Sequence, residues 1–184
     1  MSASRGSDRV WAGAVVCSYP DLVVMEEAWV EGKSTFPYIP GFLSFREIPV
    51  LLEALNRLKT RPDVILCDGQ GTAHPRRMGL ASHLGLLLDR STIGCAKSRL
   101  VGEFSNLKPG KGSFSFLYHK GRVIGAAART RAGVKPVFVS PGNRITLEES
   151  LEIVFYCSPK YRIPEPLRRA HNLVIRIRKE SSSG

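Results

Sequence analysis

A short apolar run that leads directly into an acid and a glycine-rich loop constrains this chain more than any other stretch. Val64-Ile-Leu-Cys67 predicts a buried strand, and Asp68 stands where that strand ends. The residues after it read Gly-Gln-Gly-Thr-Ala-His-Pro-Arg-Arg77. A carboxylate at a strand end, followed by a flexible loop with histidine and arginine, suits the binding of a metal ion and a phosphate.

Size and composition exclude several classes of protein. The chain has 184 residues, of which 43% are hydrophobic and 23% charged, and this mixture is typical of one globular domain. No apolar run is long enough to cross a bilayer, and the N-terminus lacks the apolar core of a secretory signal. We therefore expect a cytoplasmic protein with no membrane partner. We expect a disordered N-terminus over 1–9, a single domain over 10–179 and a frayed tail over 180–184.

The charge balance favours a polyanionic partner. The chain has 27 Lys and Arg against 16 Asp and Glu, a net charge of +11. Neutralising phosphates releases counterions, which favours binding to nucleic acid, although a merely basic protein is the alternative. Cationic side chains gather in a Gly/Pro-containing region and at the C-terminal end: Lys97, Arg99, Lys108 and Lys111, then Lys160, Arg162, Arg168, Arg169, Arg176, Arg178 and Lys179.

The cysteines indicate no metal or redox chemistry. Cys17, Cys67, Cys95 and Cys157 are scattered and form no CxxC pair, so neither a zinc ribbon nor a redox motif is indicated. We interpret them as small buried hydrophobes in a reducing compartment.

Hydrophobic periodicity predicts a mixed α/β fold. A β-hairpin over 10–30 comes first, and strands and helices then follow in turn, which indicates a mixed sheet with helices on its faces. Pro49 fits a helix start or a kink, and Leu80, Leu84 and Leu87 are expected to face inward from one helix. We predict further strands over 63–67, 92–96, 114–118, 123–128 and 136–139, helices over 45–58, 78–88, 145–156 and 164–178, and a flexible basic loop over 101–113.

Four residues are candidates for phosphodiester chemistry. Asp68 is a candidate metal ligand. An alternative of equal weight is that it caps the turn that follows it. Lys97 is expected at a second strand end, where it could contact a phosphate or a leaving oxygen, unless it is simply exposed. His74 could hold water or phosphate near Asp68, or be polar surface. Glu47 is expected at the start of a helix. Without further information, we interpret it as a solvated acid that the helix dipole favours.

An aromatic residue on a rigid loop completes the set of candidates. Tyr38 lies between Pro37 and Pro40, and the prolines stiffen the segment. Such a ring could wedge into a base stack, or it could be buried in the core.

The chain resembles the endonuclease V family over nearly its whole length, from about Val10 to the last helix. The resemblance rests on several long motifs that occur in the same order as in that family. They are Phe36-Pro-Tyr-Ile-Pro-Gly-Phe-Leu-Ser-Phe-Arg-Glu47, Asp68-Gly-Gln-Gly-Thr-Ala-His-Pro-Arg-Arg77, Gly79-Leu-Ala-Ser-His-Leu-Gly85, Ile93-Gly-Cys-Ala-Lys-Ser-Arg-Leu100 and Arg162-Ile-Pro-Glu-Pro166. The resemblance implies a ribonuclease-H-like mixed sheet flanked by helices.

The resemblance also implies a DNA repair activity. Members use Mg²⁺, for which Mn²⁺ substitutes, to nick DNA near deaminated bases, chiefly deoxyinosine (hypoxanthine). The cut falls at the second phosphodiester bond on the 3′ side of the lesion and leaves 3′-hydroxyl and 5′-phosphate ends. Some members prefer inosine-containing RNA. We expect this deoxyribonuclease V-type endonuclease to act as a monomer.

Roles follow by position in the matched motifs. Glu47 and Asp68 correspond to two of three metal-binding acids, Lys97 to the active-site lysine, and His74 and His171 to histidines at the site. Tyr38 corresponds to the wedge that holds the duplex open. The remaining positions expected to contact DNA or line the pocket for an extruded base are Pro37, Ile39, Pro40, Gly41, Leu43, Gly69, Leu80, Gly94, Ser98 and Leu100.

One part of the family pattern has no match. The family begins with a central strand that carries a third metal-binding Asp, and the resemblance places the start of this chain just past it. Asp8 and Asp21 do not lie on such a strand and are not assigned that role. Three hypotheses stay open: an endonuclease shown without its first strand, a catalytically impaired truncated form that binds inosine-containing nucleic acid without cleaving it, and a general nuclease or ribonuclease.

Overall fold

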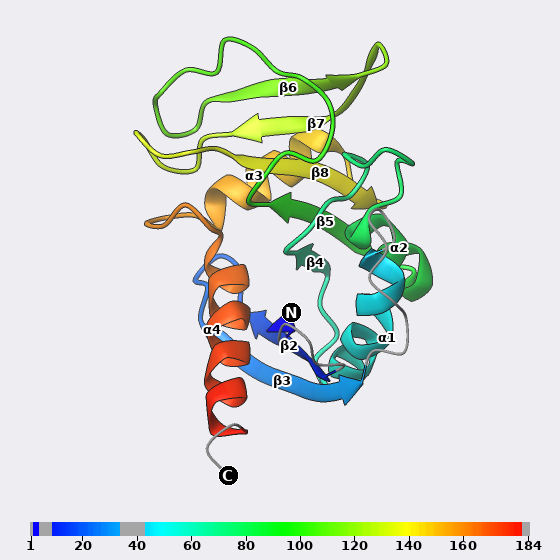
Figure 1. Cartoon of the computed structure of the whole chain (residues 1–184). Helices are drawn as coiled ribbons and strands as arrows, with labels where there is room; N and C mark the ends of the chain where they lie inside the picture. Colours follow the sequence, from blue (N-terminus) through cyan, green and yellow to red (C-terminus); the bar gives the residue numbers. More distant parts are fainter. Residues whose placement is uncertain (1, 4–8, 34–42, 182–184) are drawn as a thin grey trace. The chain divides into compact units, whose positions relative to one another are not determined.

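The structure is a computed structural model that describes residues 2–3, 9–33 and 43–181, with side chains over 9–33 and 47–181. The chain forms two compact units (Figure 1). The first consists of Met1–Pro62 together with Pro166–Gly184, and the second of Asp63–Glu165. The predicted division into a disordered N-terminus over 1–9, a single domain over 10–179 and a frayed tail over 180–184 stays a prediction.

The first unit contains a three-stranded antiparallel sheet. Strand β2 (Arg9–Cys17) pairs with β3 (Val24–Lys33) in the predicted hairpin, with Val10 opposite Gly32. On its other side β2 pairs with a two-residue strand, β1 (Ser2–Ala3). These two residues fall in the segment predicted to be disordered. Their backbone groups pair with the edge of β2, with Ser2 opposite Trp11 and Ala3 opposite Val10.

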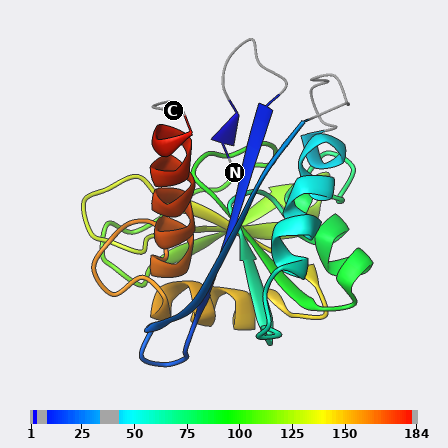
Figure 2. The same cartoon turned by 90° about the horizontal axis from the view of Figure 1, so that it is seen from below.

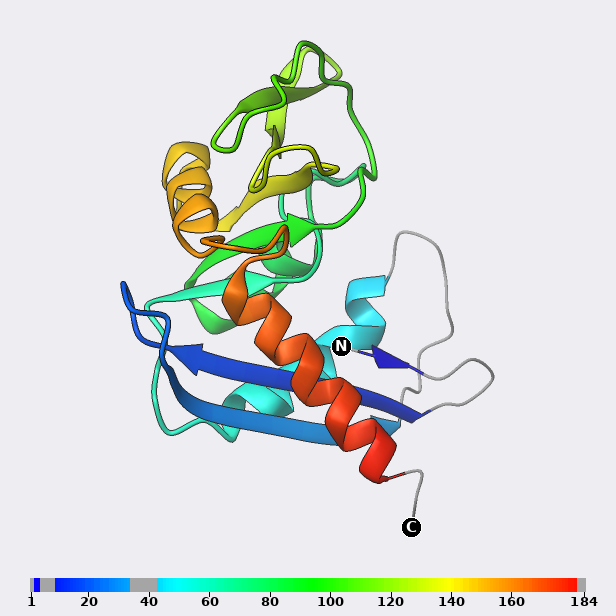
Figure 3. The same cartoon turned by 90° about the vertical axis from the view of Figure 1, so that its left-hand side faces the viewer.

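Helices cover both faces of this sheet. Alternate residues of β2 point to opposite faces, and helix α1 (Leu43–Asn56) packs on one while α4 (Glu165–Glu180) packs on the other (Figures 2 and 3). The cluster on the α1 face is Val10, Ala12, Val30, Val50 and Ala54, and that on the α4 face is Trp11, Leu173, Val174 and Ile177. A side chain at Gly13 would lie 2.7 Å from Val174, so glycine sets how closely α4 approaches the strand.

Helix α1 departs from one expectation. Pro49 lies inside the helix and not at its start, so of the two places predicted for it, a start or a kink, the start is excluded. A proline ring removes one backbone donor from the interior of a helix and destabilises it. The neighbouring Ile48 and Val50 are buried, and burial of apolar side chains of this kind supports the helix at this point.

The second unit is built on a mixed five-stranded sheet. Its strand order is β4-β5-β8-β7-β6, in which β4 and β5 are parallel and the other neighbours antiparallel (Figure 1). Helices α2 and α3 flank it, so the predicted mixed α/β sheet is confirmed. The elements are β4 (Val64–Cys67), α2 (Leu80–Leu88), β5 (Ser91–Ala96), β6 (Phe114–His119), β7 (Arg122–Ala128), β8 (Val137–Asn143) and α3 (Leu147–Tyr156).

The packing of α2 differs from the predicted leucine stripe. Leu84 is buried, but Leu87 is 54% exposed, so the expectation that it faces inward is wrong. The face against the sheet is centred on small residues, including Ala81 and Gly85. A Cβ at Gly85 would lie 2.3 Å from Thr92 Oγ1, so the helix is too close to the sheet for a larger side chain there. The buried stripe is therefore rotated from the one that the leucines predicted.

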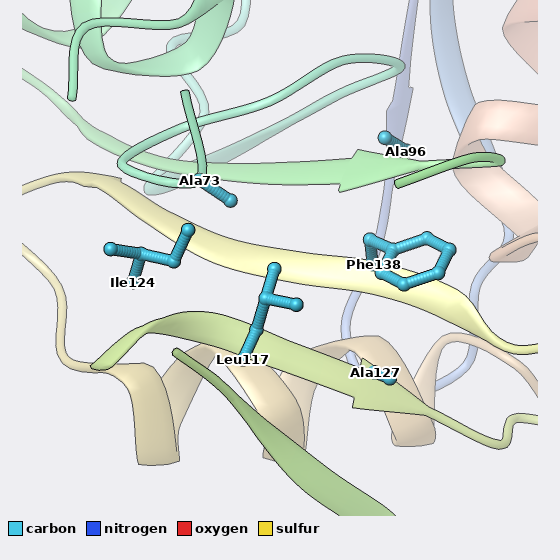
Figure 4. Close-up of a cluster of buried hydrophobic side chains, with 6 residues drawn as sticks. All are labelled: Ala73, Ala96, Leu117, Ile124, Ala127 and Phe138. Carbon is cyan, nitrogen blue, oxygen red and sulfur yellow. The ribbon is translucent and has the colours of Figure 1, made fainter. Parts of the chain in front are cut away.

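A loop, and not a helix, covers part of the core of this unit. The buried cluster is Ala73, Ala96, Leu117, Ile124, Ala127 and Phe138 (Figure 4), and Val101, Phe104 and Leu107 pack against it. Glu103 also exchanges two backbone hydrogen bonds with Tyr118, of 2.8 and 2.9 Å. The segment predicted as a flexible loop over 101–113 therefore has fixed contacts, because its apolar residues contribute to the core.

The local signal for the start of α3 is confirmed, and three of the four cysteines, Cys67, Cys95 and Cys157, are buried as predicted, whereas Cys17 is half-buried. Thr146 caps the helix by accepting a hydrogen bond from Glu149 N, and Glu149 accepts one from Thr146 N in return. All four cysteines are free thiols. Within the described ranges, no helix combines the length and apolarity needed to cross a bilayer.

Candidate active site

Two parallel strands bring Asp68 and Lys97 together. Asp68 follows β4 and Lys97 follows β5, and Cys67 lies opposite Gly94 in the pairing of these strands. The carboxyl ends of parallel neighbours meet at one edge of a sheet, so residues that follow them are close in space. Lys97 Nζ donates a hydrogen bond of 2.6 Å to Asp68 Oδ2. The carboxylate and the cation are both partly exposed, and a ligand can reach them.

Glycines allow the loop after Asp68 to lie directly on the sheet and on the start of α2. A Cβ at Gly94 would lie 2.2 Å from Gly71 N, and one at Gly71 would lie 2.1 Å from Pro141 O. A Cβ at Gly79 would lie 2.2 Å from Gln70 O. These distances are shorter than any van der Waals contact, so the three positions accept no side chain unless the backbone moves.

Hydrogen bonds hold the same loop in place. Gly71 N donates to Ser140 Oγ at 2.9 Å, and Thr72 N donates to Pro141 O at 2.8 Å. Gln70 Nε2 donates to the carbonyl of Ser98 at 3.0 Å, which ties the loop to the segment after Lys97. Asp68 is therefore presented by a backbone that is fixed on both sides, the arrangement that a preorganised site requires.

His74 lies in this loop as a neutral side chain. It is buried, and burial lowers the pKa of its imidazole, with a smaller contribution from the positive charge of Arg76. Its Nδ1 accepts a hydrogen bond of 3.3 Å from Arg76 N. The acceptor geometry assigns the proton of the neutral ring to Nε2. The structure thus gives His74 a role in shaping the loop, besides any contact with substrate.

We expect His74 to make the stability of the protein depend on pH. Its folded pKa lies below the unfolded value, so its contribution is present above pH of about 6.5 and is lost as pH falls through the folded pKa. In His74→Asn, the amide oxygen can replace Nδ1 as acceptor and does not titrate. Thermal unfolding between pH 7.5 and 5 should show a smaller decrease in Tm for this variant than for the wild type. Equal decreases would contradict the assignment.

Arg162 fixes the segment after β5 and the segment before β8, a role that was not predicted from the sequence. Its Nη2 donates to the carbonyls of Lys97 (2.6 Å) and Pro136 (2.8 Å), and its Nε donates to that of Lys135 (2.8 Å). The guanidinium therefore positions the backbone of Lys97. Its place at the head of the Arg-Ile-Pro-Glu-Pro motif was the one available signal, because these carbonyl partners lie far away in sequence.

The thiol beside this site is not a nucleophile. Burial, with a smaller contribution from the negative charge of Asp68, raises the pKa of Cys95 to about 12. A thiol with that pKa remains protonated at neutral pH, and only the thiolate is reactive. Chemistry at this edge of the sheet therefore depends on Asp68, Lys97 and what they bind.

Some predicted pocket residues come together and others do not. A Cβ at Gly69 would lie 3.3 Å from Leu80, and one at Gly94 would lie 2.8 Å from Gly69 O, so these three residues are neighbours. Ser98 joins them through Gln70. Leu100 is 53% exposed, and no described contact links it to the others.

The remaining predicted residues lie in the first unit or outside the described residues. Glu47 is on α1 and is half-buried, and His171 is on α4 and is exposed. Leu43 begins α1, and its side chain falls outside those described. The predicted wedge and its neighbours, Pro37, Tyr38, Ile39, Pro40 and Gly41, lie outside the described residues altogether.

The donor set around Asp68 suits a hard cation. Over the residues that the structure describes, no three His, Cys, Asp or Glu side chains form a group that could hold a metal ion. Mg²⁺, however, is usually held by one or two carboxylates together with waters and substrate phosphates. A partly exposed carboxylate at a strand end, with a lysine beside it, fits such shared coordination.

Comparisons with known proteins agree on one family. A family model described as Endonuclease V matches residues 1–172. Endonuclease V of Trichormus variabilis is 56% identical over 162 residues, which are 88% of this chain and 73% of the relative. The crystal structure of endonuclease V from Streptomyces avermitilis is similar with a TM-score of 0.94 and 45% identity, over 98% of this chain and 79% of that one.

A third relative carries a nucleic acid. The crystal structure of Ciona intestinalis endonuclease V in complex with a 24mer DNA, which contains an inosine followed by a ribo-adenosine, has a TM-score of 0.85 and 32% identity to this chain. The match covers 97% of this chain and 83% of that one.

Proposed function

The chain belongs to the endonuclease V family, and from this premise we propose that it is a DNA repair endonuclease that nicks DNA at deaminated bases, chiefly deoxyinosine. The inosine-containing DNA bound by the Ciona intestinalis relative supports this substrate. The net charge of +11 suits a polyanion. We propose that the protein acts in the cytoplasm as a monomer, with inosine-containing RNA as a further substrate.

The ion pair at the strand ends carries the proposal. Lys97 Nζ lies 2.6 Å from Asp68 Oδ2, so a cation and a carboxylate face the same small space. The carboxylate would hold Mg²⁺, or Mn²⁺ in its place, with Glu47 as the second proposed ligand. When bound, such an ion activates water and neutralises charge on the scissile phosphate. Lys97 would contact a non-bridging or leaving oxygen of that phosphate.

The rest of the chain would position the substrate. The loop that carries Gly69 and Gln70 is held on β5 by close backbone contacts, so its backbone groups would be fixed in place to read an extruded base. We propose that Gly41, Leu43, Gly69, Leu80, Gly94 and Leu100 line the base pocket, with Ser98 as a substrate contact. Tyr38, on the loop with Pro37, Ile39 and Pro40, acts as the wedge, and His74 and His171 support the site.

Single-turnover nicking tests the proposal. The substrate is a labelled duplex with one deoxyinosine, and the control is the same duplex with deoxyadenosine. We expect a cut at the second phosphodiester bond on the 3′ side of deoxyinosine, with 3′-hydroxyl and 5′-phosphate ends, and only with Mg²⁺ or Mn²⁺. Inosine-selective binding without a cut would replace the proposal by a non-cleaving lesion binder. Equal cutting of both duplexes would indicate a general nuclease.

A further inference from the structure

Three aromatic rings lie in a row on one face of β6. Phe114, Phe116 and Tyr118 are 45%, 38% and 51% exposed, whereas Leu117 between them is buried on the opposite face. The ring centroids of Phe114 and Phe116 are 5.5 Å apart, and those of Phe116 and Tyr118 are 6.5 Å apart, with edge-to-face geometry. We call these three residues the β6 aromatic row. Exposed large apolar side chains in contact with one another mark a binding surface more often than isolated ones do.

The backbone edge of β6 is closed although β6 is the last strand of its sheet. Its order places it beside β7 only (Figure 1). On its other side, Glu103 exchanges backbone hydrogen bonds with Tyr118, and Ser115 Oγ donates to Ser105 O at 2.6 Å. The segment before β6 therefore blocks addition of a strand from another chain, whereas the ring faces remain accessible.

The charge around the row is predominantly positive, although the acid Glu103 pairs with Tyr118 through its backbone. Residues 104–147 contain eight Lys and Arg and no Asp or Glu, a net charge of +8. Lys120 lies in the turn after β6 and Arg122 begins β7, and both are exposed with no ion-pair partner in the described part of the chain. Lys111 is exposed just before the row and donates to Pro159 O at 2.9 Å. Cations thus stand at both ends of the rings.

We propose that the β6 aromatic row binds a segment of unpaired, single-stranded DNA. Aromatic rings in a basic surface bind single strands because bases stack on the rings while lysine and arginine neutralise the phosphates. Duplex DNA does not fit this role, since its base faces are stacked on one another. A second copy of this chain does not fit either, because it would bring a segment of charge +8 against another of the same sign and meet a closed strand edge.

This surface is distinct from the strand ends at Asp68 and Lys97, and the proposal does not rest on lesion recognition. It can therefore be tested with an undamaged strand and without a divalent metal. The probe is a fluorescein-labelled oligo(dT) of about 20 nucleotides, long enough to span a site of several nucleotides. Fluorescence anisotropy with the full chain gives the Kd at several salt concentrations.

Substitutions at the central ring are the decisive variants. We expect Phe116→Ala to weaken oligo(dT) binding about tenfold, within the range typical of one stacked base. Phe116→Tyr should bind like the wild type, whereas Phe116→Leu, which keeps an apolar side chain but has no ring, should behave like Phe116→Ala. Circular dichroism checks that each variant is folded. Nicking of a short deoxyinosine duplex should not change in Phe116→Ala, which separates this proposal from the proposed function.

The chain offers a matched control. Trp29 on β3 is 39% exposed, close to the value for Phe116, but lies among Glu26, Glu27 and Glu31. Trp29→Ala should leave oligo(dT) binding unchanged. Lys120→Gln combined with Arg122→Gln should lower the slope of log K against log salt by about 1.4, the value for two fewer phosphate contacts on a single strand.

Three results would overturn the proposal. The first is an unchanged Kd in Phe116→Ala, and the second is wild-type binding by Phe116→Leu, which would show that no stacking is involved. The third is self-association of the wild type in sedimentation velocity that Phe116→Ala abolishes while oligo(dT) binding stays the same. That last result would assign the row to contact between copies of the chain.

Discussion

Asp68→Asn is expected to lower single-turnover nicking of a deoxyinosine duplex by about a thousandfold, roughly 4 kcal/mol of activation free energy. Asparagine keeps the size of the side chain but removes the negative charge that would hold a divalent cation. The ion pair with Lys97 is lost as well, but both side chains are partly exposed. Such pairs contribute under about 1 kcal/mol to folding, so the variant should remain folded.

Asp63→Asn provides the matched control for this experiment. Asp63 directly precedes β4 and Asp68 directly follows it, so the two acids stand at opposite ends of the same strand. Asp63 is exposed, and we expect its replacement to leave nicking within twofold of the wild type. Inosine binding by gel shift should persist in both variants. Nicking by Asp68→Asn at the wild-type rate would remove Asp68 from the proposed chemistry.

Gly94→Ala is expected to destabilise the protein by about 3 kcal/mol or more. The new methyl would lie 2.2 Å from Gly71 N, 2.6 Å from Gln70 C and 2.8 Å from Gly69 O, and all three are backbone atoms. A flexible side chain could rotate away, but here the loop itself must move. Because that loop begins at Asp68, nicking should decrease together with stability. Urea unfolding followed by circular dichroism measures the first effect.

Gly110→Ala is the corresponding control. A Cβ at Gly110 would meet nothing closer than Ser113 Oγ at 3.7 Å, and its backbone is not in the left-handed region. Its free energy of unfolding should lie within about 0.5 kcal/mol of the wild type, as for most surface substitutions. If Gly94→Ala is as stable as Gly110→Ala, the loop does not lie on β5 as the structure has it.

Local patterns in the sequence were enough to predict most of the elements. The apolar runs over 64–67 and 92–96 form β4 and β5, and Thr146 begins a helix through its own side chain. The helical period of α2 was also read correctly, but its orientation was not. Leucines suggested the buried face, whereas Ala81 and Gly85 face the sheet, because a short distance between helix and sheet selects small residues. That distance is a tertiary property that periodicity does not contain.

The candidate site shows the same division between local and long-range information. The expectation that Asp68 and Lys97 both stand at strand ends followed from short apolar runs, and the parallel pairing of β4 and β5 brings them together. Arg162 was missed because its partners are the carbonyls of Lys97, Lys135 and Pro136, to which sequence gives no clue.

The glycines that hold the loop on β5 also have a genetic consequence. Glycine codons are silent only at the third base, and every other single-base change adds a side chain or stops translation. At Gly71, Gly79 and Gly94 even the smallest addition meets backbone atoms at 2.1–2.2 Å. Nearly every amino-acid substitution at these three positions should therefore abolish the function of the protein. A random-mutagenesis screen for lost repair should recover changes at these codons far more often than at Gly110.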